Sequence, residues 1–177
     1  MRIFNGFAGL VSALALAAAS AQAQDQSSSN LVAEKTDWGV YEDTDPKECW
    51  GVSVPKEVVN TRDGRVVAAN RGQILLMVFY RPGADANGVV TFTGGYPFAD
   101  GSKVNLEIGG TNFSLFTSGE WAWSENAQED TKIVEAMKRG ANAVVTGLSS
   151  RGTTTQDTFS LLGFTAALEE AQKRCAS

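Results

Sequence analysis

The sequence predicts an all-β fold, mostly antiparallel and either sandwich-like or barrel-like, with two short helices, one mid-chain and one C-terminal. Short runs of strand-forming residues recur between turn signals such as Asp63-Gly64 and Gly109-Gly110. Their spacing of about 8 to 12 residues is typical of sandwiches and barrels. Two segments, near residues 128–140 and 164–173, instead show the periodicity of helices.

The first 23 residues have the composition of a signal peptide. Arg2 precedes an apolar stretch over residues 7–19, and Ala21-Gln22-Ala23 has the small-x-small pattern that signal peptidase reads, which predicts cleavage after Ala23. The apolar stretch is shorter than the about 20 residues that span a bilayer. No second long apolar run follows, so we expect no transmembrane segment in the mature chain. The expected location is periplasmic or secreted.

The rest of the chain divides into a lead-in and one domain. Residues 24–36 (QDQSSSNLVAEKT) are polar and poor in aromatic residues, which predicts a flexible lead-in. Residues 37–177 are predicted to form a single β-rich domain, because they have the length of one ordinary domain with its own core.

Strands are predicted along this domain in a regular order. The first two, DWGVY and CWGVSV, lie on either side of an acidic loop, EDTDPKE, and a hairpin turns at Asp63-Gly64. ILLMVFY (74–80) is a continuous apolar run, which predicts a central strand buried on both faces. Further strands are expected in GVVTFTGGYPF, KVNLEI, FSLF and GEWAW, and in a pair over residues 141–162 joined by SSRGTTTQ.

Two helices interrupt the strands. In the first, residues 128–140, three apolar side chains share one face, acidic residues occupy the first turn, and Lys138, Arg139 and Gly140 close the last turn. The second, at about 164–173, has one apolar stripe: Phe164, Ala167, Leu168 and Ala171.

Composition excludes several classes of function. The net charge is −5, which argues against nucleic acid and anionic lipid as partners, since both need clustered Lys and Arg. The chain contains no histidine, which removes Ser-His-Asp and Cys-His triads and His-ligated zinc. We expect no cofactor and no catalytic or metal-binding residues.

The two cysteines, Cys49 and Cys175, both lie in the mature part of the chain. An oxidising compartment and an even count favour one disulfide, with two buried free thiols as the alternative. A bridge would tie an early strand to the last helix and close almost the whole mature chain.

Five segments of the sequence are distinctive when taken together: PKECWGVSVPKE, FTGGYPFADGS, GEWAW, MKRGANAVVTGLSSRGT and DTFSLLGFTAALEEAQKRC. They resemble the invasion-associated locus B family of Gram-negative envelope proteins. The resemblance covers roughly residues 37–175 and implies a secreted, β-rich domain with a terminal helix, linked by name to host-cell invasion. Many members carry an additional mid-chain cysteine pair where this chain has residues 119–123. That leaves Cys49 and Cys175 as the one available bridge, and the family implies no catalytic residues.

Four residues are candidate ligand contacts: Tyr96, Trp121, Trp123 and Arg151. Trp121 and Trp123 lie two apart, so on a strand both rings face one side. They form either an aromatic platform for a sugar or part of the core, and the high average burial of tryptophan favours the core. Tyr96 follows two glycines that allow either a close approach to a ligand or a bent strand. Arg151 lies in the polar stretch 149–156, which is either a recognition loop or an ordinary hairpin tip.

Two groups of acidic residues are weaker candidates. EDTDPKE gathers enough carboxylates for calcium but lacks the spacing of a calcium-binding loop, so a solvated acidic loop is the other interpretation. Glu107, Glu120 and Asp157 are conceivable members of a carboxylate pair in a glycan hydrolase.

The sequence thus favours a non-catalytic periplasmic or secreted envelope module that binds a protein or glycan partner from the envelope or the host. The alternatives are an accessory factor in envelope integrity or assembly and a carboxylate-based glycan hydrolase.

Overall fold

The computed structural model describes residues 30–84 and 86–176, so the predicted signal peptide and the first part of the predicted lead-in lie outside the described residues. The described chain forms twelve strands and two helices. Their bounds are β1 Leu31–Lys35, β2 Trp38–Thr44, β3 Lys47–Ser53, β4 Glu57–Arg62, β5 Arg65–Val66, β6 Leu75–Arg81, β7 Ala86–Thr93, β8 Lys103–Ile108, β9 Thr111–Ser118, β10 Trp121–Trp123, α1 Ala127–Arg139, β11 Asn142–Leu148, β12 Thr154–Ser160 and α2 Phe164–Cys175.

All strands belong to one continuous antiparallel sheet. Its order is β1-β2-β3-β6-β7-β10-β9-β8-β11-β12-β4-β5, and every pairing is antiparallel. This confirms the predicted class, a mostly antiparallel β fold with one mid-chain and one C-terminal helix. Two long steps occur in the order: β3 and β4 are consecutive in sequence but lie far apart in the sheet, and so do β5 and β6.

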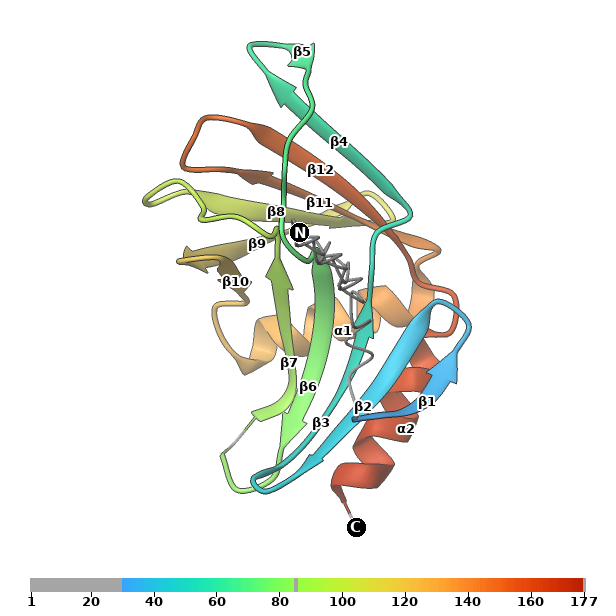
Figure 1. The fold of residues 1–177 in the computed structure, drawn as a ribbon. Coiled ribbons are helices and arrows are strands. Elements are labelled where there is room, and N and C mark those ends of the chain that lie inside the picture. The colour runs from blue at the N-terminus through green and yellow to red at the C-terminus, as the bar shows by residue number, and fades with distance from the viewer. Residues whose placement is uncertain (1–29, 85, 177) are drawn as a thin grey trace, which may run out of the picture.

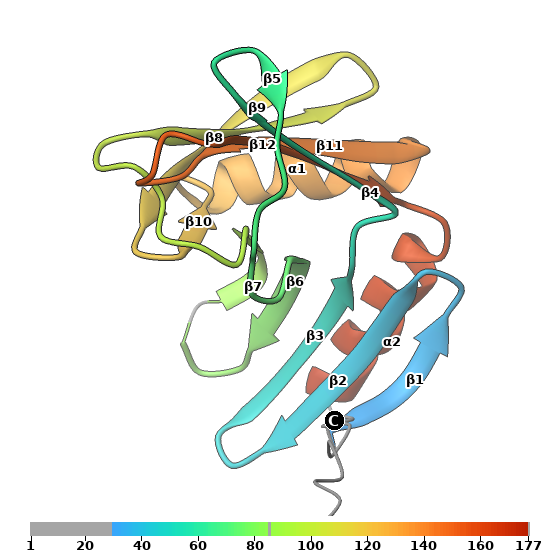
Figure 2. The ribbon, with the colours of Figure 1, turned by 45° about the horizontal axis from the view of Figure 1, so that its top comes forward.

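The sheet bends strongly, so its two halves cross (Figures 1 and 2). In Figure 1, strands β1, β2, β3, β6 and β7 run down the molecule, and β4, β8, β11 and β12 lie across its top. The bend brings inner faces together: the ring of Phe92 on β7 meets that of Phe159 on β12, with centroids 6.1 Å apart. Helix α2 covers β1, β2, β3 and β6, whereas α1 packs on β7 and meets α2.

Inward and outward residues alternate along the strands, as the period of a strand requires. On β6, Leu76, Val78 and Tyr80 are buried on the inner face, but the alternate residues are only partly buried. The prediction that this strand is buried on both faces is therefore wrong. The two helices cover the inner side, and the outer side keeps a half-exposed apolar surface.

Two segments predicted to be irregular are strands. Leu31–Lys35, in the predicted lead-in, forms β1 and pairs with β2. Most of the predicted acidic loop belongs to β2 and β3, and only the Asp45-Pro46 pair lies between them. Polar composition predicted loops there, but an exposed strand needs few apolar side chains when neighbouring strands satisfy its backbone hydrogen bonds.

The residue that precedes each helix explains why the helix begins there. Asn126 caps α1 by accepting hydrogen bonds from the backbone N–H groups of Gln128 and Glu129. Helix α2 follows Gly163, whose φ of 89° is left-handed, and a side chain there would collide with the carbonyl of Lys35. Glycine is required at this position because the chain both turns into the helix and touches β1. Among the described residues, no helix is long and apolar enough to cross a membrane.

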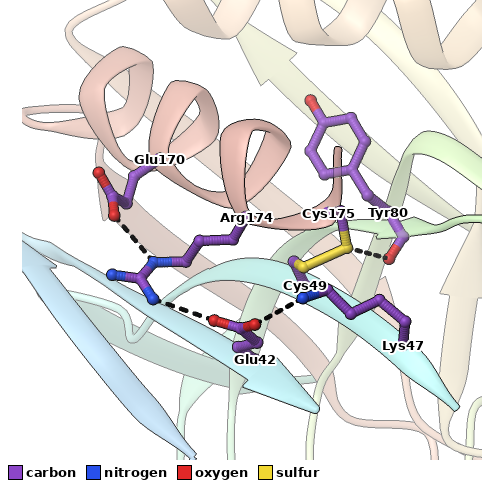
Figure 3. The surroundings of a disulfide bond; sticks show 7 residues. All are labelled: Glu42, Lys47, Cys49, Tyr80, Glu170, Arg174 and Cys175. Atoms are coloured by element: carbon purple, nitrogen blue, oxygen red, sulfur yellow. Dashed lines mark hydrogen bonds and ion pairs between the residues drawn. A yellow bond between two sulfur atoms is a disulfide. The ribbon is translucent and has the colours of Figure 1, made fainter. Parts of the chain in front are cut away.

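The last residue of α2 is joined to the sheet by a disulfide between Cys49 of β3 and Cys175 (Figure 3). Beside it, Glu42 accepts hydrogen bonds from Lys47 Nζ at 2.7 Å and from Arg174 Nη1 at 3.0 Å. The hydrogen bond from Lys47, followed by that from Arg174, holds the pKa of Glu42 below its ordinary value. A covalent link and an ion-pair network therefore fasten the C-terminal helix to β2 and β3.

Candidate functional sites

A groove lined by aromatic side chains lies on the outer face of the sheet, opposite the helices. Its lining residues come from β3, β6, β7 and β10 and enclose about 310 Å³. We call them the aromatic groove: Glu48, Trp50, Met77, Phe79, Arg81, Thr91, Trp121 and Trp123.

Strand register explains why these side chains meet. Trp50 on β3 pairs directly with Phe79 on β6, and Tyr41 on β2 pairs with Trp50. One row further along, Met77 pairs with Thr91, which in turn pairs with Trp123 on β10. Residues in one row of an antiparallel sheet point to the same face, so four separate strands build one surface.

The rings are held in fixed relative orientations. Tyr41 and Trp50 stack with centroids 5.7 Å apart and an interplanar angle of 8°. Phe79 meets Trp123 edge-on at 6.1 Å, and Trp121 lies 6.1 Å from Trp123. Such pairs contribute beyond the area they bury, so the surface is preorganised.

Charge is present at one rim of the groove. Arg81 Nη2 donates to both carboxylate oxygens of Glu48, at 2.9 and 3.0 Å. The Arg81 guanidinium also lies over the ring of Phe79, 5.8 Å from its centroid. The rim therefore offers a cation and a carboxylate beside flat apolar rings.

The candidates Trp121 and Trp123 both belong to this groove, where Trp121 is 37% exposed and Trp123 partly buried. The residue between them, Ala122, is fully buried on the inner face. The structure therefore places these two tryptophans on the outer face of the sheet and not in the core. Trp38 differs: it is 1% exposed, and its indole N–H donates to the carbonyl of Ser160.

The candidates Tyr96 and Arg151 line a different cavity, of about 330 Å³. We call it the arginine pocket. Its walls are Arg62, Val67, Ala68, Ala69, Asn70, Arg71, Gly95, Tyr96, Pro97, Glu120, Ser149, Ser150, Arg151, Thr153 and Thr155. Most of these residues lie in loops and hairpin ends, between elements far apart in sequence.

Arg71 is the central side chain of this pocket, and no local pattern in the sequence points to it. Its side chain is 5% exposed, and it forms a two-pronged ion pair with the fully buried Asp157 of β12, at 2.7 and 2.6 Å. Its Nε donates to the carbonyl of Gly94 at 2.8 Å, and Nη1 also donates to Asn60. Burial raises the pKa of Asp157, and the hydrogen bonds and charge of Arg71 act in the opposite direction.

The ring of Tyr96 packs against the guanidinium group of Arg71. The guanidinium carbon of Arg71 lies 5.1 Å from the Tyr96 ring centroid, and the Tyr96 hydroxyl is hydrogen-bonded to Thr155. Tyr96 is 9% exposed, and burial raises its pKa. The two glycines before it allow the backbone of Gly95 to touch that of Gly72, whose N–H donates to the Gly95 carbonyl at 2.8 Å.

The three candidate carboxylates do not share one site. Glu107 is exposed on the outer face of β8, whereas Asp157 is buried on the inner face and paired with Arg71. Register places Asp157 opposite Val145 and Glu107 opposite its neighbour Val144, which confirms that the two point to opposite sides. Glu120 lies in the arginine pocket. In the described residues, no cluster of acidic or cysteine side chains could hold a metal ion.

Comparison with known proteins decides the family. A family model described as Invasion associated locus B (IalB) protein matches residues 42–172. The chain belongs to the IalB family. A solved structure of invasion associated protein B from Bartonella henselae is similar in fold, with a TM-score of 0.54 at 16% identity, covering 83% of this chain and 99% of that one. No curated protein matches the sequence.

Within the IalB family, the chain's candidate residues thus fall on two surfaces. Trp121 and Trp123 belong to the aromatic groove, and Tyr96 and Arg151 belong to the arginine pocket. The two surfaces approach each other at the turn between β9 and β10, where Glu120 lines the pocket and Trp121 the groove.

Proposed function

We propose that this IalB-family protein is a non-catalytic binding module of the cell envelope and that it holds a glycan in the aromatic groove. The observation that carries the proposal is the outer face itself: three tryptophans and a phenylalanine from three strands, β3, β6 and β10, line one groove on the side of the sheet opposite the two described helices. The preformed sheet would recognise a ligand without first ordering a loop, which reduces the cost of binding.

The groove matches the chemistry of sugars. A sugar ring has an apolar face that packs on a flat aromatic ring and a rim of hydroxyl groups that need hydrogen-bond partners. Among residues 30–84 and 86–176, no acceptor pairs with the indole N–H groups of Trp50, Trp121 or Trp123, whereas Trp38 is satisfied internally. The Glu48 and Arg81 side chains at the rim add polar groups that fix orientation.

The location we propose is the periplasm or the cell exterior. The predicted leader with cleavage near Ala23 supports it, and so does a disulfide, a bond that persists in oxidising compartments. The IalB family and the Bartonella protein are both named for invasion. We therefore propose that the bound glycan belongs to the bacterial envelope or to a host surface met during invasion.

Calorimetric titration tests the proposal. The purified oxidised protein is titrated with soluble peptidoglycan fragments and with a panel of host-surface oligosaccharides. We expect saturable binding to at least one of them, weakened about tenfold by Trp121→Ala, since exposed tryptophans in binding surfaces often dominate the energy. Leu162→Ala is the matched control, because Leu162 is 61% exposed and lies outside the groove.

Two results would overturn this proposal. One is that no glycan binds. The other is that Trp121→Ala and Leu162→Ala bind the glycan equally well, which would place the contact elsewhere.

A further inference from the structure

The arginine pocket collects positive charge in an acidic protein. Three arginines line it, Arg62, Arg71 and Arg151, although the chain has a net charge of −5. Asp157 neutralises Arg71, and Glu120 is the one carboxylate among the lining residues. The pocket walls together with Asp157 therefore carry a net charge of +1, three positive against two negative groups.

The charge is held in place by buried contacts rather than by mobile surface chains. The terminal nitrogens of Arg71 carry four hydrogens. Three of them are used, two by Asp157 and one by Asn60. The fourth, on Nη2, has no acceptor among the described residues, and Arg71 is one of the residues that line the pocket. The Tyr96 ring and the Gly94 carbonyl fix the plane of the guanidinium.

The other two arginines lie around the opening. Arg62 Nη2 donates to the Thr153 hydroxyl at 2.7 Å, which anchors it to the hairpin between β11 and β12. Arg151 is exposed at the tip of that hairpin. Within the described part of the chain, neither arginine has a carboxylate partner at ion-pair distance.

The remaining walls combine small apolar side chains with polar ones. Val67, Ala68 and Ala69 form one side, and Pro97 contributes another. Ser150 and Thr153 add hydroxyl groups. A ligand here would therefore place an anionic group against the arginines and a short aliphatic body against the small side chains.

We propose that the arginine pocket binds a monocarboxylate with a small aliphatic body, such as the free carboxyl terminus of a short alanine-rich peptide. Guanidinium groups match the planar carboxylate with paired hydrogen bonds. A carboxylate brings one negative charge, which balances the net +1 of the walls, whereas a phosphate monoester brings between about −1.5 and −2. This site is separate from the aromatic groove and does not depend on glycan binding there.

Calorimetry with three probes tests the assignment: N-acetyl-alanyl-alanine, its C-terminal amide, and inorganic phosphate. We expect the acid to bind, the amide to bind at least tenfold more weakly, and phosphate to compete poorly. Arg151→Gln and Arg62→Gln should each weaken binding of the acid about tenfold, the loss expected for a hydrogen bond to a charged group. Both positions lie at the opening, so neither variant disturbs the buried Arg71 pair.

Two matched variants complete the test. Arg65→Gln removes an exposed arginine of the neighbouring strand β5 that does not line the pocket, and it should bind the acid as the unmodified protein does. Trp121→Ala should also leave this affinity unchanged. The proposal is overturned if the acid does not bind, if amide or phosphate binds as well as the acid, or if Arg65→Gln weakens binding as much as Arg151→Gln.

Discussion

The aromatic groove and the arginine pocket are built by opposite means. The groove is made of strand residues whose side chains are brought together by sheet register, with half-exposed rings as its lining. The pocket is made of turns and connecting segments, held together by one buried ion pair between Arg71 and Asp157. A surface built on strands should tolerate the loss of one side chain. A pocket held by a buried charge pair should not tolerate the loss of either partner.

The largest effect is expected at the disulfide that fastens α2 to β3, the strand that carries Trp50. Cys49 and Cys175 are 126 residues apart, and the loop-entropy account gives at most about 5 kcal/mol of stability for such a closure. Replacing both cysteines with serine should lower the free energy of unfolding by several kcal/mol in denaturant titrations. Reduction of the unmodified protein should give the same result. A loss of unfolding free energy below about 1 kcal/mol would contradict the claim that the disulfide contributes strongly to stability.

The next effect separates the pocket from the groove. Arg71→Met leaves the Asp157 carboxylate buried without its partner and should cost about 3 to 5 kcal/mol of unfolding free energy. The double variant Arg71→Met/Asp157→Leu should be markedly more stable than the single one, because the unpaired charge is gone. Equal stability of the two variants would show that the arginine acts by packing alone.

A smaller effect tests the alternation along β10. Ala122 is fully buried between two outward-facing tryptophans, so Ala122→Leu should overpack the inner face and cost about 2 kcal/mol. Trp121→Ala, one residue earlier, should cost about 1 kcal/mol or less. Thermal unfolding of both variants measures this difference, and the reverse ranking would contradict the inward and outward assignment.

The smallest effect is a pH dependence at Glu42, beside the disulfide. Lys47 and Arg174 hold its folded pKa below the ordinary value of 4.5. The stability that this carboxylate contributes is therefore present above pH 4.5 and is lost as the pH falls through the lowered folded pKa. The difference in unfolding midpoint between the unmodified protein and Glu42→Gln should shrink on going from neutral pH to acid. A difference that stays constant would show that the ion pairs do not contribute.

The sequence predicts the groove better than the pocket, for a physical reason. The spacing of Trp121 and Trp123 is local, and strand period alone places both rings on one side. Which side they face depends on where the helices pack, so local spacing leaves the core alternative open. Trp50 and Phe79 join the groove through pairing between strands, which local patterns do not specify.

The pocket depends almost entirely on distant contacts. Arg71 lies in a polar stretch without periodicity, and its partner Asp157 is 86 residues away. The sequence indicates Tyr96 and Arg151 as separate candidates, because Tyr96 follows two glycines and Arg151 lies in a polar hairpin tip. Nothing local indicates that they line one cavity. The same reasoning explains β1, whose polar sequence forms a strand because β2 offers a ladder of hydrogen bonds.

The most direct test of the central claim, that the outer aromatic face is the binding surface, uses the indole N–H signals of the four tryptophans in NMR spectra. During titration with a bound glycan, the signals of Trp50, Trp121 and Trp123 should shift, and that of the buried Trp38 should stay in place. Four unmoved signals, or a shift confined to Trp38, would contradict the claim.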